Sequence, residues 1–363
     1  MNKIKSVYIH IPFCNSICSY CDFCKVVYSQ EWVKPYFEKL ENEIDNSYLG
    51  EEIETLYISG GTPSCLNLEQ LQELFRILDK FHKKDTIEFT FECNLNDIEE
   101  EKFTFLYNHG VNRLSIGIES FDPEKLKFMK RTSEFKDAKK KIKLLRNIGF
   151  QNINIDLMYA IPNETIKVLK SDLKKILKLK PEHISTYSLI IEKNTLVGLN
   201  KIKPIEEEHD FKMYDTICKI LKKKGYLHYE VSNFAKKGFS SKHNLTYWNN
   251  EEYYGFGVGA SGFVEAIRYE NTKSLTEYLK GNFVSSKSLM SKVDNMENEL
   301  ILGLRKLEGI NLEHFFDKFE ENIQNIFPIK PLVKSGDLIY KDGYIYINPK
   351  KLYVMNEILL KLI

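Results

Sequence analysis

Residues 7–24 read Val-Tyr-Ile-His-Ile-Pro-Phe-Cys-Asn-Ser-Ile-Cys-Ser-Tyr-Cys-Asp-Phe-Cys, and they hold four of the seven cysteines of the chain. The apolar run over residues 7–11 predicts a buried strand, which ends at Pro12. The next three cysteines have the spacing C-x3-C-x2-C and are Cys14, Cys18 and Cys21. The sequence therefore predicts three thiols on one loop that leaves the carboxyl end of a strand.

Three thiolates on one loop suit an iron–sulfur cluster. A [4Fe–4S] cluster is usually held by four cysteines, so three ligands leave one iron open to another group. The alternative is a four-cysteine zinc site, which normally uses two separated C-x2-C pairs. No separate second pair follows this loop. We therefore predict a [4Fe–4S] cluster bound by these three cysteines.

The spacing resembles that of the radical S-adenosylmethionine (SAM) superfamily, in which three cysteines hold a [4Fe–4S] cluster and SAM chelates the open iron. The segments Tyr8-Ile-His-Ile-Pro-Phe-Cys and Cys21-Asp-Phe are similar to the oxygen-independent coproporphyrinogen III oxidase group. Within that group they most resemble the HemW-type haem chaperones. The resemblance implies SAM and haem as ligands besides the cluster.

Composition excludes several classes of partner. The chain has 363 residues with 52 basic and 51 acidic side chains, and the resulting net charge of +1 does not favour nucleic acid or an anionic membrane. The lysines at 136, 139, 140 and 143 are expected on a solvated helix face. An odd number of clustered cysteines is not a disulfide framework, which predicts a cytoplasmic protein. No apolar run reaches the ~18 residues that an integral membrane segment needs.

Apolar strands alternate with amphipathic segments about six times, which predicts βα units around a parallel sheet. The expected later strands cover 55–59, 87–92, 113–118, 152–157 and 183–188, and the expected helices cover 30–46, 67–81, 97–109, 134–148 and 165–179. Asn96 and Asp97 are expected to cap the third helix, and Asp122-Pro123 to start a further one. Periodicity does not separate a doubly wound sheet from a barrel. The resemblance implies a partial (β/α)6 radical SAM barrel.

Polar or backbone-exposing residues follow successive strands, and the carboxyl ends of parallel strands share one rim. The resemblance assigns a group of these residues to SAM: Tyr8, Gly60, Gly61, Thr62, Glu92, Glu119, Arg131 and Asp156. Glu119 departs from the glutamine common in the family, and an ionised glutamate can only accept hydrogen bonds. Tight turns, surface charges and strand packing are the simpler explanations for several of these positions.

The second half begins with an expected helix up to residue 224 and a strand over 227–232. Residues 243–248 read His-Asn-Leu-Thr-Tyr-Trp, which matches the H-N-x-x-Y-W segment of the HemW-type proteins. That match implies a haem contact at His243, whereas a lone histidine is ordinarily a packed or surface residue. The glycine-rich stretch 255–262 is expected to be a loop on the barrel mouth.

The last part is expected to be a small winged-helix-like α+β domain. We predict helices over 296–307, 311–324 and 350–362, and a hairpin at 338–347 with an Asp-Gly turn. The expected division is a barrel over 1–200, a barrel-capping extension over 201–282 and a C-terminal domain over 283–363. No basic recognition helix supports DNA binding.

Two functions remain open on the sequence. The first is a haem chaperone that binds the cluster, SAM and haem and delivers haem to an acceptor protein. The second is an oxygen-independent coproporphyrinogen III oxidase, which decarboxylates propionates. The oxidases place a Gly-Cys pair just after the third cysteine, whereas Asp22-Phe23 precedes Cys24 here, and the longer oxidases extend before the first strand. These features favour the chaperone. The resemblance also implies a reductant such as flavodoxin or ferredoxin.

Overall fold

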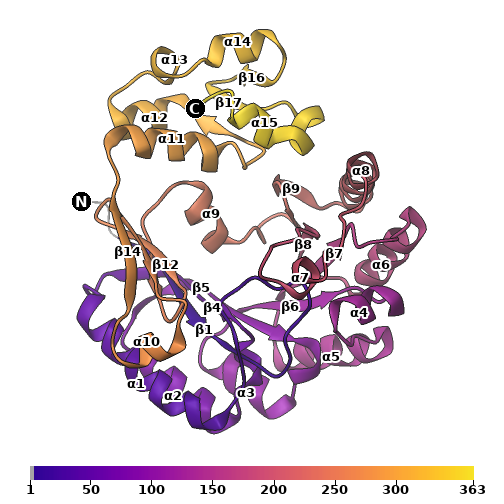
Figure 1. Ribbon diagram of the computed structural model, residues 1–363, viewed down its shortest axis with the longest axis vertical. Helices are drawn as coiled ribbons and strands as arrows, with labels where there is room; N and C mark the ends of the chain where they lie inside the picture. The colour runs from indigo at the N-terminus through magenta and orange to yellow at the C-terminus, as the bar shows by residue number, and fades with distance from the viewer. Residues whose placement is uncertain (1–3) are drawn as a thin grey trace.

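The computed structural model describes residues 4–363 (Figure 1). Nine strands form its main sheet, in the spatial order β11 (Tyr254–Phe256), β1 (Ser6–Ile11), β4 (Glu52–Gly60), β5 (His82–Asn94), β6 (Arg113–Glu119), β7 (Asn152–Tyr159), β8 (His183–Ser188), β10 (Asn233–Ala235) and β9 (Leu227–Glu230). From β1 to β8 every pair is parallel, and the strands follow chain order. Parallel strands that follow chain order without a change of direction across the sheet are typical of a barrel. This barrel is open, because the edge strands β11 and β9 do not pair with each other. The predicted partial (β/α)6 barrel is confirmed.

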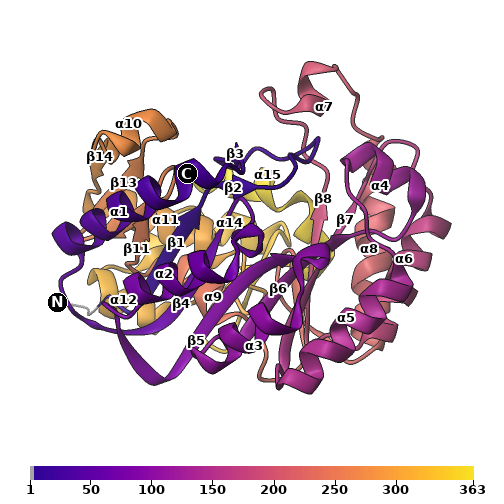
Figure 2. The same cartoon turned by 90° about the horizontal axis from the view of Figure 1, so that it is seen from below.

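Amphipathic helices cover the outer face of the sheet (Figure 2). They are α1 (Gln30–Ser47), α2 (Leu68–Leu78), α3 (Glu100–Asn108), α4 (Pro123–Met129), α5 (Phe135–Ile148) and α6 (Ile166–Leu179). In α1, Val33, Phe37 and Leu40 are buried at helical spacing, as their sequence positions predict. Trp32, which we also expected on this apolar face, is 40% exposed.

Of the two helix starts predicted from capping residues, the start of α4 is correct and the start of α3 is not. The Asp122 side chain accepts hydrogen bonds from the backbone of Glu124 and Lys125, so α4 begins at Pro123 as predicted. The predicted cap at Asn96 and Asp97 is wrong, because α3 begins at Glu100 after a short 3-10 turn, η2 (Leu95–Asp97). Asp97 instead accepts a hydrogen bond from Ser64, and Asn96 donates one to Thr132.

The segment after β8 adds strands and helices around the barrel. The helices α7 (Leu196–Leu199), α8 (Glu207–Lys223), α9 (Lys242–Trp248) and α10 (Leu275–Leu279) lie in this segment, and a second sheet contains β12 (Ser261–Val264), β13 (Ile267–Asn271) and β14 (Val284–Leu289). The loop predicted over 255–262 is shorter in the structure and covers 257–260, because residues 255 and 256 belong to β11, which pairs with β1, and β12 begins at Ser261. A Cβ at Gly255 would lie 1.9 Å from the Ser261 carbonyl oxygen, so glycine allows the close strand return.

The C-terminal part lies above the barrel in Figure 1. It contains α11 (Lys292–Gly303), β15 (Ile310–Asn311), α12 (Leu312–Phe319), α13 (Ile323–Ile326), α14 (Ile329–Lys334), β16 (Leu338–Lys341), β17 (Tyr344–Ile347), η3 (Pro349–Val354) and α15 (Met355–Leu359). The predicted hairpin is present, and its turn residues Asp342 and Gly343 both have positive φ angles. The helices expected at 311–324 and 350–362 are each divided in two. The three-part division of the chain stays a prediction.

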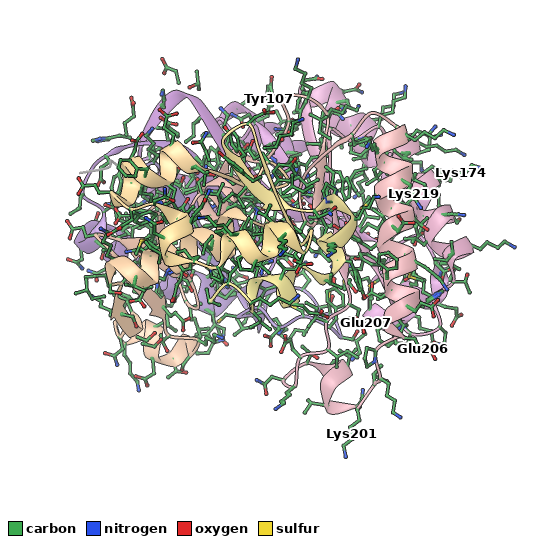
Figure 3. All side chains as sticks on the ribbon, turned by 90° about the horizontal axis from the view of Figure 1, so that it is seen from above. Tyr107, Lys174, Lys201, Glu206, Glu207 and Lys219 are labelled. Carbon is green, nitrogen blue, oxygen red and sulfur yellow. The ribbon has the colours of Figure 1, made fainter. Side chains whose placement is uncertain are left out.

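Charged side chains such as Lys174, Lys219 and Glu207 point away from the helices into solvent (Figure 3). The lysines at 136, 139, 140 and 143 are likewise exposed, as expected for a solvated face. Among residues 4–363, no helix combines the length and the apolar character needed to cross a membrane.

Candidate functional site

A cavity of about 1050 Å³ opens at the carboxyl ends of the parallel strands. The residues that we predicted as ligand contacts all line it: Tyr8, Cys14, Cys18, Cys21, Gly60, Gly61, Thr62, Glu92, Glu119, Arg131, Asp156 and His243. They lie on six strands or directly after them, on the loop over residues 14–24, on α9 and, for Arg131, just after α4. The structure thus brings together in one cavity the residues that the resemblance assigns to ligands.

The segment over residues 14–24, named the Cys loop below, is closed at its base by β2 (Phe13–Cys14) and β3 (Val26–Val27). The Cys14 Sγ lies 3.5 Å from the Thr62 hydroxyl, and Arg131 Nη1 donates to the Cys18 Sγ at 3.4 Å. Burial raises the pKa of the Cys14 and Cys21 thiols. Cys24 does not line the cavity, and its thiol donates to the Lys273 carbonyl.

The donor set fits a cluster better than a single ion. Within residues 4–363, no three His, Cys, Asp or Glu side chains converge where one metal ion could sit. Iron–sulfur clusters are held by thiolates, and the three thiols face one cavity that Lys25 and Arg131 also line. These two cations would offset part of the negative charge of the thiolates.

Close packing explains why glycine stands at the end of β4, in addition to any contact with a ligand. Gly60 has φ +116°, and a Cβ there would lie 2.8 Å from the His10 ring. A Cβ at Gly61 would lie 2.7 Å from the Phe13 carbonyl oxygen. Because both positions exclude a side chain, the β4 end packs directly on β1 and exposes its backbone to the cavity.

His10 lies next to the cavity residue Tyr8 and supports the site, although the sequence prediction did not include it. Its Nε2 donates to the Cys24 carbonyl at 2.7 Å, which leaves Nδ1 to accept a hydrogen bond from the Tyr8 hydroxyl at 3.1 Å. Burial lowers the pKa of His10 to about 4, so the ring is neutral at physiological pH. The only sequence signal was a histidine within an otherwise apolar strand.

Three carboxyl groups gather on the side of the cavity formed by β5, β6 and β7. Tyr57 donates to Glu92 at 2.7 Å, and burial raises the pKa of Glu92. Burial, followed by the charges of Glu119 and Glu92, raises the pKa of Asp156 to about 8. Asn154 donates to Asp156 at 2.8 Å. A cation bound beside these carboxyl groups would favour their ionised form, so this side of the cavity suits a ligand that carries a positive charge.

Arg131 faces the same acidic group and ties it to the Cys loop. Its Nη2 donates to the Asn94 side chain at 2.6 Å and to the Gly117 carbonyl. Burial lowers the pKa of Arg131, but the Glu119 carboxylate raises it to a net value above the ordinary one. Glu119 itself has φ +65°, where the register of β6 against β7 shifts. The guanidinium therefore stays charged between carboxylates and the Cys18 thiol.

His243 lies in α9 at the cavity wall and is only 1% exposed. Its Nδ1 pairs with the Thr55 hydroxyl and its Nε2 with the Tyr247 hydroxyl, both at 2.7 Å. The ring stacks on Tyr57 with centroids 4.9 Å apart, and burial lowers the pKa of His243 to about 3. Glu88 accepts the backbone N–H of His243, which fixes the start of α9. Neither ring nitrogen is free in this conformation.

Comparisons with known proteins agree with this arrangement. The model of the radical SAM superfamily matches residues 8–176, and that of the HemN C-terminal domain matches residues 290–353. Heme chaperone HemW of Lactococcus lactis is 40% identical, with 94% of this chain and 92% of that protein covered. The proteins of the same name from Bacillus subtilis and Escherichia coli are 36% and 33% identical, over 98% and 84% of this chain and 98% and 83% of theirs.

The solved structure of coproporphyrinogen III oxidase (HemN) from Escherichia coli superposes with a TM-score of 0.86. The alignment covers 99% of this chain and 89% of that one at 22% identity, which supports the shared fold alone. The near-complete coverage of curated relatives at 33–40% identity supports the narrower assignment. The chain belongs to the HemW family of radical SAM proteins.

Proposed function

We propose that this protein is a haem chaperone that binds a [4Fe–4S] cluster, SAM and haem and delivers haem to an acceptor protein. The observation that carries the proposal is the convergence of all twelve predicted contacts on one cavity. Relatives named heme chaperone HemW support the haem-delivery part.

In this proposal Cys14, Cys18 and Cys21 hold the cluster. SAM lies against the exposed backbone of Gly60, Gly61 and Thr62 and against Tyr8, Glu92, Glu119, Arg131 and Asp156. The acidic side of the cavity supports this choice, because SAM carries a sulfonium cation. A cluster with SAM on its open iron supplies one-electron chemistry, while these side chains orient the ligand and exclude water.

Haem would occupy the part of the cavity next to α9, with His243 as a contact. Ligation of iron by Nε2 requires that the hydrogen bond to Tyr247 opens, because iron needs the nitrogen lone pair. Burial keeps the imidazole neutral, which is the protonation state that a ligand needs. The neighbouring Tyr57 and Tyr247 rings offer flat apolar surfaces for a porphyrin.

A haem acceptor and a reductant such as flavodoxin or ferredoxin are the expected protein partners. We place the protein in the cytoplasm. All seven cysteines are unpaired in the structure, which suits a reducing compartment.

The test starts with anaerobically reconstituted protein whose iron and sulfide contents have been measured. The protein is incubated with SAM, a reductant and coproporphyrinogen III, and the porphyrin is weighed by mass spectrometry. We expect an intact substrate, together with saturable haem binding and haem transfer to a haem-free acceptor protein. A product that has lost two carboxyl groups would identify an oxidase instead. Haem binding no stronger than to serum albumin would also contradict the proposal.

A further inference from the structure

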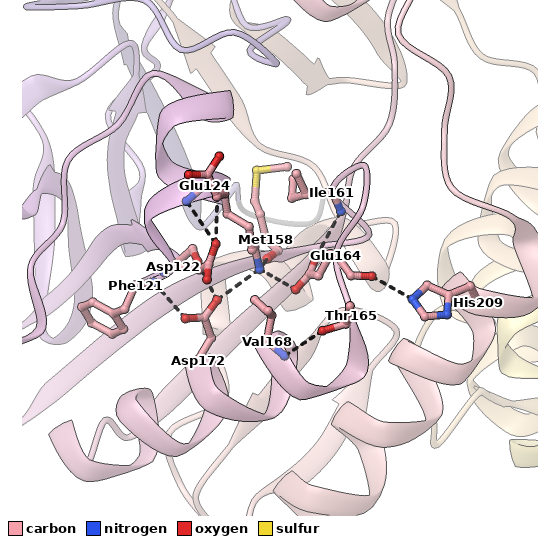
Figure 4. Close-up of polar contacts among 12 residues, drawn as sticks. Phe121, Asp122, Glu124, Met158, Ile161, Glu164, Thr165, Val168, Asp172 and His209 are labelled. Atoms are coloured by element: carbon pink, nitrogen blue, oxygen red, sulfur yellow. Dashed lines mark hydrogen bonds and ion pairs between the residues drawn. The ribbon is translucent and has the colours of Figure 1, made fainter.

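A buried ion cluster lies behind the cavity. It is formed by Lys125 of α4, by Glu164 in the segment between β7 and α6, and by Asp172 of α6. Figure 4 shows Glu164 and Asp172 with their polar contacts. All three residues are at most 5% exposed. The Lys125 ammonium donates to Glu164 at 2.6 Å, to Asp172 at 3.1 Å and to the Met158 carbonyl at 2.9 Å. Its three protons are therefore all used, and the Lys125 side chain joins α4 to Glu164, to Asp172 and to the end of β7.

The two carboxylates hold the ends of neighbouring strands. Asp172 accepts hydrogen bonds from the Ser120 hydroxyl at 2.5 Å and from the Phe121 backbone at 2.9 Å, directly after β6. Glu164 accepts the Ile161 backbone N–H at 3.1 Å, two residues after the end of β7. The adjoining residues Glu119 and Met158 line the cavity. The ion cluster thus sits immediately behind the rim where ligands are proposed to bind.

At its other end α4 is bonded to the Cys loop. Ser19 lies between Cys18 and Cys21, and its hydroxyl donates to the Phe128 carbonyl at 2.7 Å. The Ser19 backbone N–H donates to the Met129 carbonyl at 3.2 Å. Two residues further on, Arg131 reaches the Cys18 thiol. A continuous series of hydrogen bonds therefore runs from the ion cluster through α4 to the cysteines.

We propose that Lys125, Glu164 and Asp172 position α4 so that it sets the geometry of the Cys loop and of Arg131. This inference rests on the proposed function for the identity of the ligand, but the positioning belongs to the chain itself. Buried ion pairs add little stability compared with apolar side chains of the same volume, whereas they impose directed contacts. Those contacts are what a short, seven-residue helix needs to be held in one place.

The test measures hydrogen exchange of the cofactor-free protein, so that it does not depend on cluster, SAM or haem. In Lys125→Met, we expect amides of the Cys loop to exchange about tenfold faster, since the loop loses its fixed support. The matched control is Lys318→Met, which removes a cation bonded to Glu299 at 2.7 Å in the C-terminal part. It should leave exchange in residues 14–24 unchanged.

A second variant separates positioning from the cost of burying unpaired carboxylates. Lys125→Met combined with Glu164→Gln and Asp172→Asn removes both negative charges, so it should regain thermal stability relative to the single variant. The Cys loop should still exchange about tenfold faster than in the wild type, because no ammonium joins the three acceptors. Asp172→Asn alone serves if Lys125→Met does not fold.

Either of two results would overturn the proposal. One is a Cys loop that exchanges at the wild-type rate in every folded variant while α4 itself exchanges faster. The other is recovery of loop protection together with thermal stability in the triple variant, which would show a purely structural ion cluster. A protein that fails to bind haem but shows the expected exchange would refute the proposed function and leave the positioning role intact.

Discussion

The Cys loop and α9 line the same cavity, yet they differ in how their polar groups are satisfied. The Cys18 and Cys21 thiols are partly exposed, and the Cys18 thiol accepts one weak hydrogen bond from Arg131. His243 is almost wholly buried, and both of its nitrogens are paired. The loop is thus arranged to take up a ligand without breaking strong contacts, whereas α9 is a packed wall that must open before its histidine can ligate iron.

The largest effect is expected at the Cys loop. Replacing Cys14, Cys18 or Cys21 with alanine should abolish the cluster, because no further cysteine lines the same cavity except Cys93, which is buried at a strand end. Iron and sulfide analysis after reconstitution checks this. Cys218→Ala, on α8 outside the cavity, is the matched control and should keep a full cluster. A full four-iron cluster in any of the three loop variants would contradict the ligand assignment.

The second prediction concerns acid stability and α9. The pKa of His243 is about 3 in the folded protein and the ordinary value is 6.5, so folding favours the neutral ring. Its stabilisation is present above pH 6.5 and is lost as the pH falls toward 3. Between pH 6.5 and 4.5 the wild type should lose about 2 kcal/mol more unfolding free energy than His243→Gln.

Urea unfolding at the two pH values measures that difference. His314→Gln, at an exposed position on α12, should lose the same free energy as the wild type. An identical pH dependence in the wild type and in His243→Gln would show that the ring is not held neutral by its packing. The packing of α9 around His243 would then be less tight than the structure indicates.

The third prediction concerns the hydrogen bond between Tyr247 and His243, which must break before His243 can ligate iron. Tyr247→Phe removes the hydroxyl that occupies His243 Nε2, which releases a hydrogen bond worth about 1 kcal/mol. Haem affinity should therefore rise about fivefold in an absorbance titration. Tyr253→Phe is the control, because its ring packs against Tyr247 at 4.6 Å but lies outside the cavity lining. Unchanged affinity in Tyr247→Phe would argue against ligation through Nε2.

The same contrast explains how much the sequence could predict. Alternating apolar runs locate β1 and β4 to β8 within a few residues, because strands buried on both faces consist of continuous apolar segments. The Cys loop is equally readable, since its chemistry depends on residue type and spacing. β11 escaped prediction because Gly255 and the glycines that follow it fit a loop, and its strand character comes from pairing with the distant β1. The exposed, serine-rich β14 gives no apolar pattern at all.

Contacts between distant segments decide the rest of the site. The role of His10 depends on the Cys24 carbonyl, and the state of His243 depends on Thr55 in β4. In the sequence, Lys125 resembles the many surface lysines. Tertiary packing instead buries its side chain between two carboxylates. Such pairings have no periodicity or spacing rule, so only the folded chain reveals them.

The smallest effect is expected at Glu119, where the family commonly has glutamine. Glu119→Gln keeps the shape of the side chain and removes one of the charges that raise the pKa of Asp156 to about 8. The Asp156 titration, followed by carbon NMR of the carboxyl group in cofactor-free protein, should therefore shift to lower pH. Cluster content should not change, and SAM affinity should stay within about threefold of the wild type.

Glu124→Gln, on the exposed side of α4, is the control and should leave the Asp156 titration unchanged. The left-handed backbone at residue 119 directs either side chain toward the cavity, so the two residues differ in charge and in donor capacity. A large gain in SAM affinity on Glu119→Gln would mean that this position must donate a hydrogen bond. An unshifted Asp156 titration would mean that the acidic side of the cavity is less tightly coupled than its burial implies. Either result would mean that the Cys loop can take up its ligand without rearrangement, whereas the end of β6 at Glu119 cannot.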